Sequence, residues 1–280
     1  MRSRSMALRV AVVAGLALQS AGVFGIGALF PRQGSGANLY TPGARAFIHR
    51  SGLREDLILQ IGFAGKPAEF AWVIPIPSRP VAQFANASIF EELRRVFNPR
   101  LIPGPGTRVP AEPGKGEQGP PPVQIQDSTI ISPYEAGALP RWLRSNGYEV
   151  PDAAYGVIQD YVKHQWFFVV ARVRASPAEN PRWLQPVWIT FQSQRAVLPI
   201  KLASLGAKPI VAQLFVAADV FVRAPGFVEA YRSDSPARTS YKQNELPLFF
   251  QVVTRDCKLT ELRRRLDPKD ISADIAIVPK

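Results

Sequence analysis

The sequence predicts an α+β domain in which about ten strands form largely antiparallel sheets and three short helices cover them. Every second residue from 57 to 63 is apolar, as expected for a half-buried strand. In residues 70–77, apolar residues occupy both sets of alternate positions, as expected for a strand that is buried on both faces. Three short stretches place apolar residues on one helical face. The 27 prolines among 280 residues also favour strands and loops over long helices.

Residues 1–30 have the layout of an export leader. The first nine residues carry three arginines, and residues 10–30 carry no charge. This pattern is typical of a secretory signal, although 21 uncharged residues could also cross a bilayer uncut. We therefore expect a signal peptide or an N-terminal membrane anchor, with a buried helix as the third alternative. Passable cleavage patterns are Leu18-x-Ser20 and Val23-x-Gly25.

The next residues, 31–44, are rich in Gly, Pro and Ser and predict a flexible arm. Residues 45–280 are then expected to form one domain. Its first hairpin joins residues 45–49 to 53–63, and the apolar strand at 70–77 follows after a turn at Gly65-Lys66-Pro67.

Each predicted helix has a start or stop signal. Ser88 and Glu91 have the spacing of a capping box, and Asn98-Pro99 ends the helix that they open. A second helix, Arg141–Asn146, is closed by Gly147, and Asp152 caps a third. These helices are expected to cover the sheets.

Residues 103–122 contain seven prolines and five glycines and predict no packed element. They are interpreted as an insertion loop, because apolar strands resume on both sides. A flexible arm that binds a partner is the alternative. Further strands are expected at 123–131, 165–174, 187–192, 196–203, 209–222, 248–254, 259–266 and 275–278, with loops at 180–186 and about 225–245.

The sequence lacks the familiar catalytic signatures. It has no GxSxG elbow, phosphate loop, dinucleotide fingerprint or HExxH motif, and its two histidines, His49 and His164, are too few for a His-rich metal site. We therefore expect no catalytic residue, cofactor or metal. Carboxylate clusters could still serve a hydrolase if two faced each other across a cleft, and these are Glu55-Asp56, Glu91-Glu92 and Asp267/Asp270/Asp274.

The one cysteine, Cys257, excludes an intramolecular disulfide and is expected to be buried. A catalytic thiolate would need a neighbouring histidine, and neither histidine is near it in sequence. Ser235 lies in a polar loop with no visible partner.

The tryptophans raise the possibility of sugar binding. Trp72, Trp166 and Trp188 lie in apolar strands and are expected to pack in the core, whereas Trp183 lies in a loop and is the candidate ligand-binding residue. The net charge of +12 would suit an anionic partner or a generally basic surface. No dense basic stripe with interleaved aromatics appears, so a nucleic-acid partner is not expected.

The ordered segments resemble the bacterial family DUF2330. The matching pieces are REDLILQIGFAGKPAEFAWVIPIPSRP (54–80), SIFEELRRVF, ISPYEAG, RWLRSNGYEVP (141–151), DYVKHQWFFVVARV (160–173), PVWITFQSQRAVLPIKLASLGA (186–207) and LTELRRRLDPKDISADIAI. The resemblance covers most of residues 45–278. It implies an exported domain of unknown function, often beside a membrane anchor, and supplies no catalytic residues.

Taken together, these observations predict an exported, non-enzymatic domain of the bacterial cell envelope that binds a protein or wall-polymer partner. It would be secreted, periplasmic or tethered to the membrane through residues 10–30. The alternative is an exported hydrolase that uses carboxylates in a cleft of the sheet.

Overall fold

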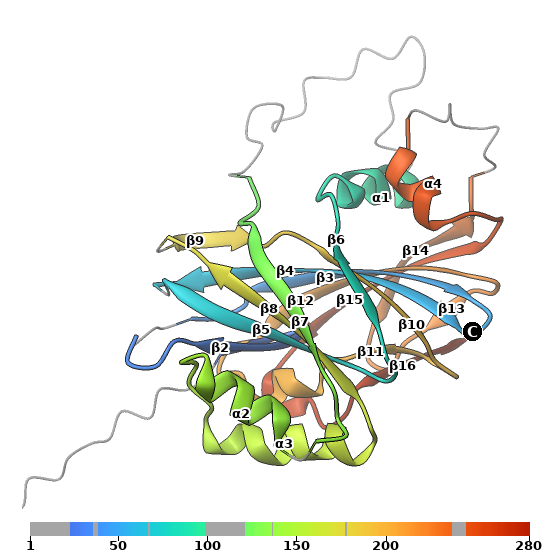
Figure 1. Cartoon of the computed structure of the whole chain (residues 1–280). Helices are drawn as coiled ribbons and strands as arrows, with labels where there is room; N and C mark the ends of the chain where they lie inside the picture. Colours follow the sequence, from blue (N-terminus) through green and yellow to red (C-terminus); the bar gives the residue numbers. More distant parts are fainter. Residues whose placement is uncertain are drawn as a thin grey trace, which may run out of the picture.

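The computed structural model describes residues 23–35, 39–66, 68–98, 121–135, 137–176, 178–236 and 245–280. These residues confirm the predicted α+β class, with mostly antiparallel sheets and four α-helices (Figure 1). The strands, numbered β1 to β16, exceed the expected ten. Among the described residues, no helix has the length and apolar character needed to cross a membrane.

The bounds of the elements follow the chain. The strands are β1 Val23–Gly25, β2 Gly27–Pro31, β3 Gly43–Ser51, β4 Arg54–Gly65, β5 Glu69–Ile76, β6 Val81–Phe84, β7 Ile125–Ile131, β8 Phe167–Arg174, β9 Ala178–Trp183, β10 Val187–Gln192, β11 Ala196–Leu198, β12 Ile210–Ala218, β13 Val222–Arg223, β14 Val228–Asp234, β15 Lys258–Leu266 and β16 Ile275–Pro279. The helices are α1 Ile89–Phe97, α2 Ala138–Ser145, α3 Asp152–Lys163 and α4 Pro247–Val252, with 3₁₀ turns at Lys201–Leu205 (η2) and Pro268–Asp270 (η3).

The strands form three sheets. One has the order β1-β2-β5-β8-β7, and a larger one has the order β14-β15-β12-β3-β4-β10-β6, with β9 paired to β4. The third has the order β11-β16-β13. The pair of β12 with β3 is parallel, and the other pairs between named strands are antiparallel.

The central core lies between the two large sheets, and its composition follows from strand parity. Leu57, Leu59 and Ile61 of β4 share this core with Trp72 and Ile74 of β5. Because alternate side chains point to opposite faces, the other parity of each strand must meet a different layer. The predicted burial of the 70–77 run on both faces is therefore confirmed, whereas residues 56–63, which were expected to be half-buried, are also buried on both faces.

Helices supply these outer layers. Ile58 of β4 packs in a cluster with the apolar faces of α1 and α4, and Val73 of β5 packs in a cluster with those of α2 and α3. Figure 1 shows the two helix pairs on opposite sides of the sheets. The covering role predicted for the helices is confirmed.

The strands continue toward the N-terminus into residues assigned from sequence to the leader. Residues 1–22 of the predicted leader lie outside the described residues, but β2 pairs with β5 and its Ala28, Leu29 and Phe30 are fully buried. Trp72 Nε1 donates to the carbonyl of Ile26 at 2.8 Å. The predicted leader boundary at residue 30 therefore falls inside β2.

The predicted arm, 31–44, also enters this body. Arg32 forms an isolated bridge with Tyr148, Tyr40 forms one with Ala64, and Leu39 is fully buried. Residues 36–38 lie outside the described part of the chain.

The predicted insertion loop at 103–122 lies outside the described residues except for Pro121 and Pro122. Strands on either side of it pair with one another: β5 pairs with β8, and β4 pairs with β10. The segments before and after the tract thus build the same sheets.

Four local assignments of strand or loop were wrong. The loop expected at about 225–245 contains β14, which pairs with β15. The strand expected at 248–254 is largely helix α4, because Pro247 opens a helical turn and Glu92 accepts hydrogen bonds from the main-chain N–H groups of Leu248 and Phe249. The loop expected at 180–186 contains part of β9, which pairs with β4. The strand expected at 196–203 ends at Leu198 and gives way to η2.

The predicted capping box at Ser88 does not form. The Ser88 side chain makes no capping hydrogen bond, and Asn86 Oδ1 instead accepts from the Ser88 N–H at 3.0 Å. Glu91 pairs with Arg94 one turn along the helix. Helix α1 nevertheless ends at Phe97, before Asn98, as predicted.

Candidate functional site

A row of polar side chains crosses the face of the eight-stranded sheet that packs against α1 and α4. His49 of β3 lies opposite Asp56 of β4, which in turn lies opposite Thr190 of β10. The same strands place Phe47 and Ile58 in the apolar cluster under these helices. The polar row therefore borders a hydrophobic layer, where an ionised group needs specific partners.

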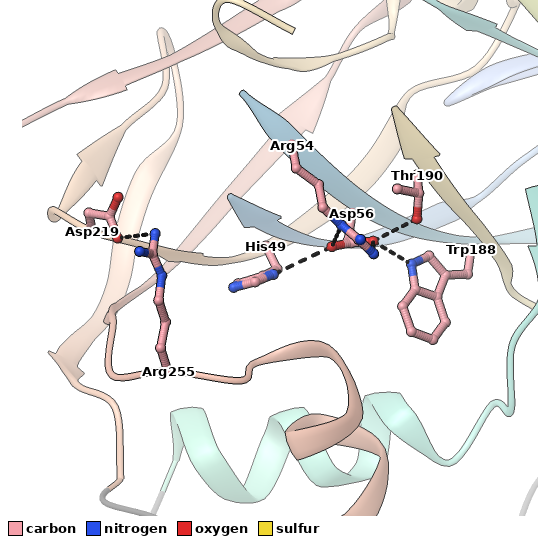
Figure 2. Close-up of polar contacts among 7 residues, drawn as sticks. All are labelled: His49, Arg54, Asp56, Trp188, Thr190, Asp219 and Arg255. Carbon is pink, nitrogen blue, oxygen red and sulfur yellow. Dashed lines mark hydrogen bonds and ion pairs between the residues drawn. The ribbon is translucent and has the colours of Figure 1, made fainter. Parts of the chain in front are cut away.

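Asp56 is the centre of this polar row (Figure 2). Its carboxylate accepts hydrogen bonds from Arg54 at 2.9 and 3.0 Å, from Trp188 Nε1 at 3.0 Å and from Thr190 Oγ1 at 2.6 Å. Burial opposes ionisation, but His49 and these three donors together hold the pKa of Asp56 below its ordinary value. The carboxylate is thus held ionised within the fold.

His49 stands beside this carboxylate without a close hydrogen bond. Its Nδ1 lies 3.6 Å from Asp56 Oδ2, and within the described chain neither ring nitrogen has a hydrogen-bond partner. The Asp219–Arg255 ion pair, at 2.7 Å, appears on the other side of His49 in Figure 2. A histidine next to a carboxylate resembles a general-base pair, but a base must reach a substrate. His49 is 4% exposed and lines none of the pockets described below, so the arrangement organises the sheet.

The carboxylates proposed for a hydrolase do not face one another at a described pocket. Glu55 and Asp56 are consecutive residues of β4 and point to opposite faces. Glu92 caps α4, and Asp274 accepts from the hydroxyl of Tyr161 and the N–H of Lys201, each at 2.7 Å. Asp56, Glu92 and Asp274 therefore have structural partners within the fold, whereas Glu55 is buried without a hydrogen-bond partner among the described residues.

Cys257 is buried, as predicted. Its N–H donates to Ser235 Oγ at 3.1 Å, which gives Ser235 a partner that the sequence did not reveal. Burial raises the pKa of the Cys257 thiol to about 11, so the thiol form dominates at neutral pH. This environment does not activate a nucleophile.

His164 lies at an open pocket of about 650 Å³, where β5 and β7 end and β8 begins. Its Nδ1 is 2.7 Å from the carbonyl of Asp160. The described residues that line the pocket include no carboxylate; they are Pro77, Ser78, Arg79, Ile130, Ser132, Tyr134, His164, Gln165 and Phe167. His164 therefore has no acidic partner there for acid–base chemistry.

Trp183, the predicted ligand-binding residue, lies at the end of β9 and is 36% exposed. The guanidinium of Arg45 lies between two rings, 4.6 Å from the centroid of Trp183 and 4.4 Å from that of Phe90. Arg45 Nε also donates to Gln60 Oε1 at 2.6 Å, and burial lowers the pKa of Arg45 to about 10. The Trp183 ring is thus held in place on one side and exposed elsewhere.

The three tryptophans that were expected to pack in the core are buried to different degrees. Trp72 is fully buried, and Trp166 and Trp188 are partly buried against apolar clusters.

An uncharged pocket adjoins the segment that carries Trp183. Val123 and Leu184 form a parallel bridge and point into the central core. Their neighbours must therefore point outward, which places Trp183 and Gln185 on the same outer face as Gln124. Gln124 and Gln185 line an open pocket of about 510 Å³, together with Phe84, Ala85, Asn86, Ala87, Ser88 and Pro122.

The composition of this amide pocket suits a neutral ligand. Its lining residues carry three carboxamides, one hydroxyl and one aromatic ring, and no charge. Carboxamides both donate and accept hydrogen bonds, and Phe84 is 39% exposed. The chemistry fits a ligand with hydroxyl groups and apolar faces. Among the described residues, no group of three or more His, Cys, Asp or Glu side chains is placed to hold a metal.

Sequence reasoning identified Trp183 but missed its surroundings. Gln124 and Gln185 lie more than sixty residues apart from one another along the chain, and their proximity depends on the bridge between Val123 and Leu184. Asp56 was recognised as part of an acidic pair, and the parity of β4 already implied that its neighbour Glu55 would point the other way.

Comparisons with known proteins identify a family and no activity. A family described as "Uncharacterized protein conserved in bacteria (DUF2330)" matches residues 33–229. No curated protein matches the chain. Among solved structures, a crystal structure of baculovirus P35 covers 87% of this chain and 98% of its own, with 6% identity and a TM-score of 0.43.

Proposed function

The chain belongs to the DUF2330 family of uncharacterized proteins conserved in bacteria, and from this premise we propose that it is an exported, non-enzymatic envelope domain that binds a wall glycan. The observation that carries the proposal is the uncharged amide pocket, whose lining residue Gln185 lies two residues along the chain from the exposed Trp183. Sugars present hydroxyl groups and apolar ring faces, which carboxamides and aromatic rings complement. Binding without chemistry is favoured because Asp56, Glu92 and Asp274 make structural contacts and burial raises the pKa of the Cys257 thiol.

The binding proposal is tested by co-sedimentation of the purified full chain with intact cell-wall sacculi. Salt of about 0.5 M suppresses adsorption by the +12 charge, because it shortens the range of electrostatic attraction. Trp183→Ala is expected to weaken sedimentation about tenfold, which corresponds to about 1.4 kcal/mol. Trp183→Phe should retain part of the binding, because it keeps a ring.

The matched control is Tyr134→Ala. Tyr134 is 73% exposed and lines the His164 pocket, so its loss should leave sedimentation unchanged. Thermal melting of each variant checks that the fold is intact. The proposal fails if the parent chain does not sediment, or if Trp183→Ala sediments as well as the parent.

Export is supported by the leader pattern and by the packing of β2. Because β1 and β2 take up residues 23–31, residues 10–22 of the uncharged stretch 10–30 remain for a leader. A membrane-spanning helix needs about 20 apolar residues, whereas a signal peptide needs about 7–15. This length favours a cleaved signal peptide over an anchor, with cleavage ahead of Val23.

Fractionation and N-terminal sequencing test the export proposal. A tagged chain should appear outside the cytoplasm with its first residue at or just before Val23. Recovery of the chain as a soluble cytoplasmic protein would contradict export. A mature chain that begins at Ile26, after the Val23-x-Gly25 pattern, would contradict the structural role given to β1.

A further inference from the structure

A third pocket, of about 340 Å³, opens where β3, β11, β12, β13 and β16 meet. It shares no lining residue with the amide pocket. Most of its wall is apolar, and its polar lining residues are Arg50, Gln194, Arg195 and Asp219; the apolar ones are Ala196, Val216, Ala218, Val220, Val222, Ile277, Val278 and Pro279. The volume is at the lower end of the range for small-molecule sites, which is about 300–1,000 Å³.

Arg50 is fixed at the edge of this pocket. Its Nη2 donates to the carbonyls of Ser193 and Gln194 at 3.0 and 2.9 Å. Its Nη1 lies 3.6 Å from Glu55 Oε2 and has no hydrogen-bond acceptor within the described chain. The guanidinium charge is therefore held in place by neutral carbonyls and by one carboxyl group.

Glu55 does not fully neutralise that charge at neutral pH. Its side chain is 0% exposed, and neither carboxyl oxygen has a hydrogen-bond partner among the described residues. Burial raises the pKa of Glu55 to about 8; the Val197 main chain and Arg50 oppose the shift, and Asp56 adds to it. Below that pH the carboxyl is mostly protonated, and the Arg50 charge lacks a counterion.

The remaining charges leave the pocket positive. Asp219 pairs with Arg255 at 2.7 Å. Arg195 is exposed and forms no ion pair within the described chain. An apolar wall with two arginines at its edge complements an anion that carries a hydrocarbon tail.

We propose that this pocket binds a small monocarboxylate with an unbranched alkyl tail. Arg195 contacts the carboxylate, Arg50 adds a fixed positive charge, and the tail lies against Val216, Val222 and Ile277. Glu55 tunes the site: when it ionises, it neutralises Arg50 and weakens the attraction for the anion. The proposal does not depend on glycan binding at the amide pocket.

Calorimetric titration of the purified full chain with octanoate tests the site. Octanoate should bind at pH 7 at least tenfold more tightly than 1-octanol, because the alcohol lacks the charge. Arg195→Gln should weaken octanoate binding about tenfold and leave octanol binding unchanged. Equal affinity for octanoate and octanol, or no octanoate binding, would overturn the proposal.

A matched pair of variants locates the site without disturbing the core. Val220 is 48% exposed at the pocket, so both Val220→Glu and Val220→Gln should fold. The glutamate should abolish octanoate binding by repulsion, and the glutamine should largely preserve it. Equal binding by the two variants would place octanoate elsewhere and refute the assignment.

The role of Glu55 has its own readout. Octanoate stays ionised from pH 6.5 to 9.5, so its affinity should fall as pH rises through about 8, where Glu55 ionises. Glu55→Gln should bind octanoate at pH 7 like the parent and keep that affinity at pH 9.5. The same fall in affinity in the glutamine variant would rule out Glu55 as its cause.

Discussion

At the scale of single residues, Glu55 and Asp56 show how the fold sets ionisation. They are adjacent in β4 but point to opposite faces. Asp56 meets Arg54, Trp188 and Thr190, and its pKa falls. Glu55 enters the core without a hydrogen-bond partner within the described chain, and its pKa rises to about 8. The two neighbouring carboxyl groups therefore differ in charge at neutral pH: Asp56 is ionised, and Glu55 is mostly protonated and neutral.

Asp56→Asn should destabilise the protein by about 2–4 kcal/mol at pH 7. The change removes the negative charge to which Arg54, Trp188 and Thr190 donate hydrogen bonds, and it leaves those donors partly buried. Urea unfolding measures the loss. Thr190→Val, which removes one donor and keeps the carboxylate, should cost less.

The sign of the pH dependence follows from the lowered pKa of Asp56. Its stabilising contribution is present above the ordinary Asp value of about 3.9 and is lost as pH falls through the lower folded pKa. The difference in unfolding free energy between the parent and Asp56→Asn should therefore shrink below pH 4. A difference that stays constant down to pH 2 would contradict this account.

At the scale of elements, the packing of β1 and β2 depends on a close approach of the Gly27 main chain to β5. Gly27 has φ of +81°, and a Cβ there would lie 2.3 Å from the carbonyl oxygen of Val73 and 2.9 Å from Trp72 Nε1. Both the backbone conformation and the space therefore require glycine. The same approach brings Ile26 to the indole of Trp72, which joins the N-terminal strands to the core.

Gly27→Ala should cost at least about 3 kcal/mol, because the added methyl group displaces β2 from β5. The matched control is Gly34→Ala. Gly34 has φ of +71°, but its Cβ would meet nothing within 4 Å, so only the backbone cost of about 1–2 kcal/mol applies. Thermal unfolding of the two purified variants separates the effects, and equal losses would show that the approach to Val73 is unimportant.

At the scale of the whole molecule, the sheets unite segments on both sides of the proline-rich tract. β4 and β5 precede it, β8 and β10 follow it, and each pairs across it. The central core draws on all three sheets. Unfolding one side should therefore expose the other.

The structure predicts a single cooperative unfolding transition. Tryptophan fluorescence reports on Trp72 in the five-stranded sheet and Trp188 in the eight-stranded one, and far-ultraviolet circular dichroism reports on the strands. The two transitions should coincide in urea. Two separated transitions would show that the parts before and after the tract fold independently.

The sequence anticipated the features that depend on local patterns. Alternation and runs of apolar residues predicted most strands, and helical spacing predicted α1 and α3. Trp183 is exposed as expected, although it lies in β9 and not in the loop on which that expectation rested. The prediction failed at α4, since the cap that Glu92 provides comes from more than 150 residues earlier in the chain. It failed at β9 because its pairing partner, β4, lies more than 110 residues earlier in the chain, outside any local window.

By itself, the sequence determined the class of the fold, the two-sided burial of the 70–77 strand and the family, because each is written in the order of neighbouring residues. Only the tertiary structure decided that residues 23–31 contain two strands, that Gln124 and Gln185 line one pocket, and that Arg50 faces a carboxyl group without a hydrogen-bond partner among the described residues. These are contacts between segments that are distant in the sequence. Their energies depend on strand register and burial, which cannot be predicted from neighbouring residues alone.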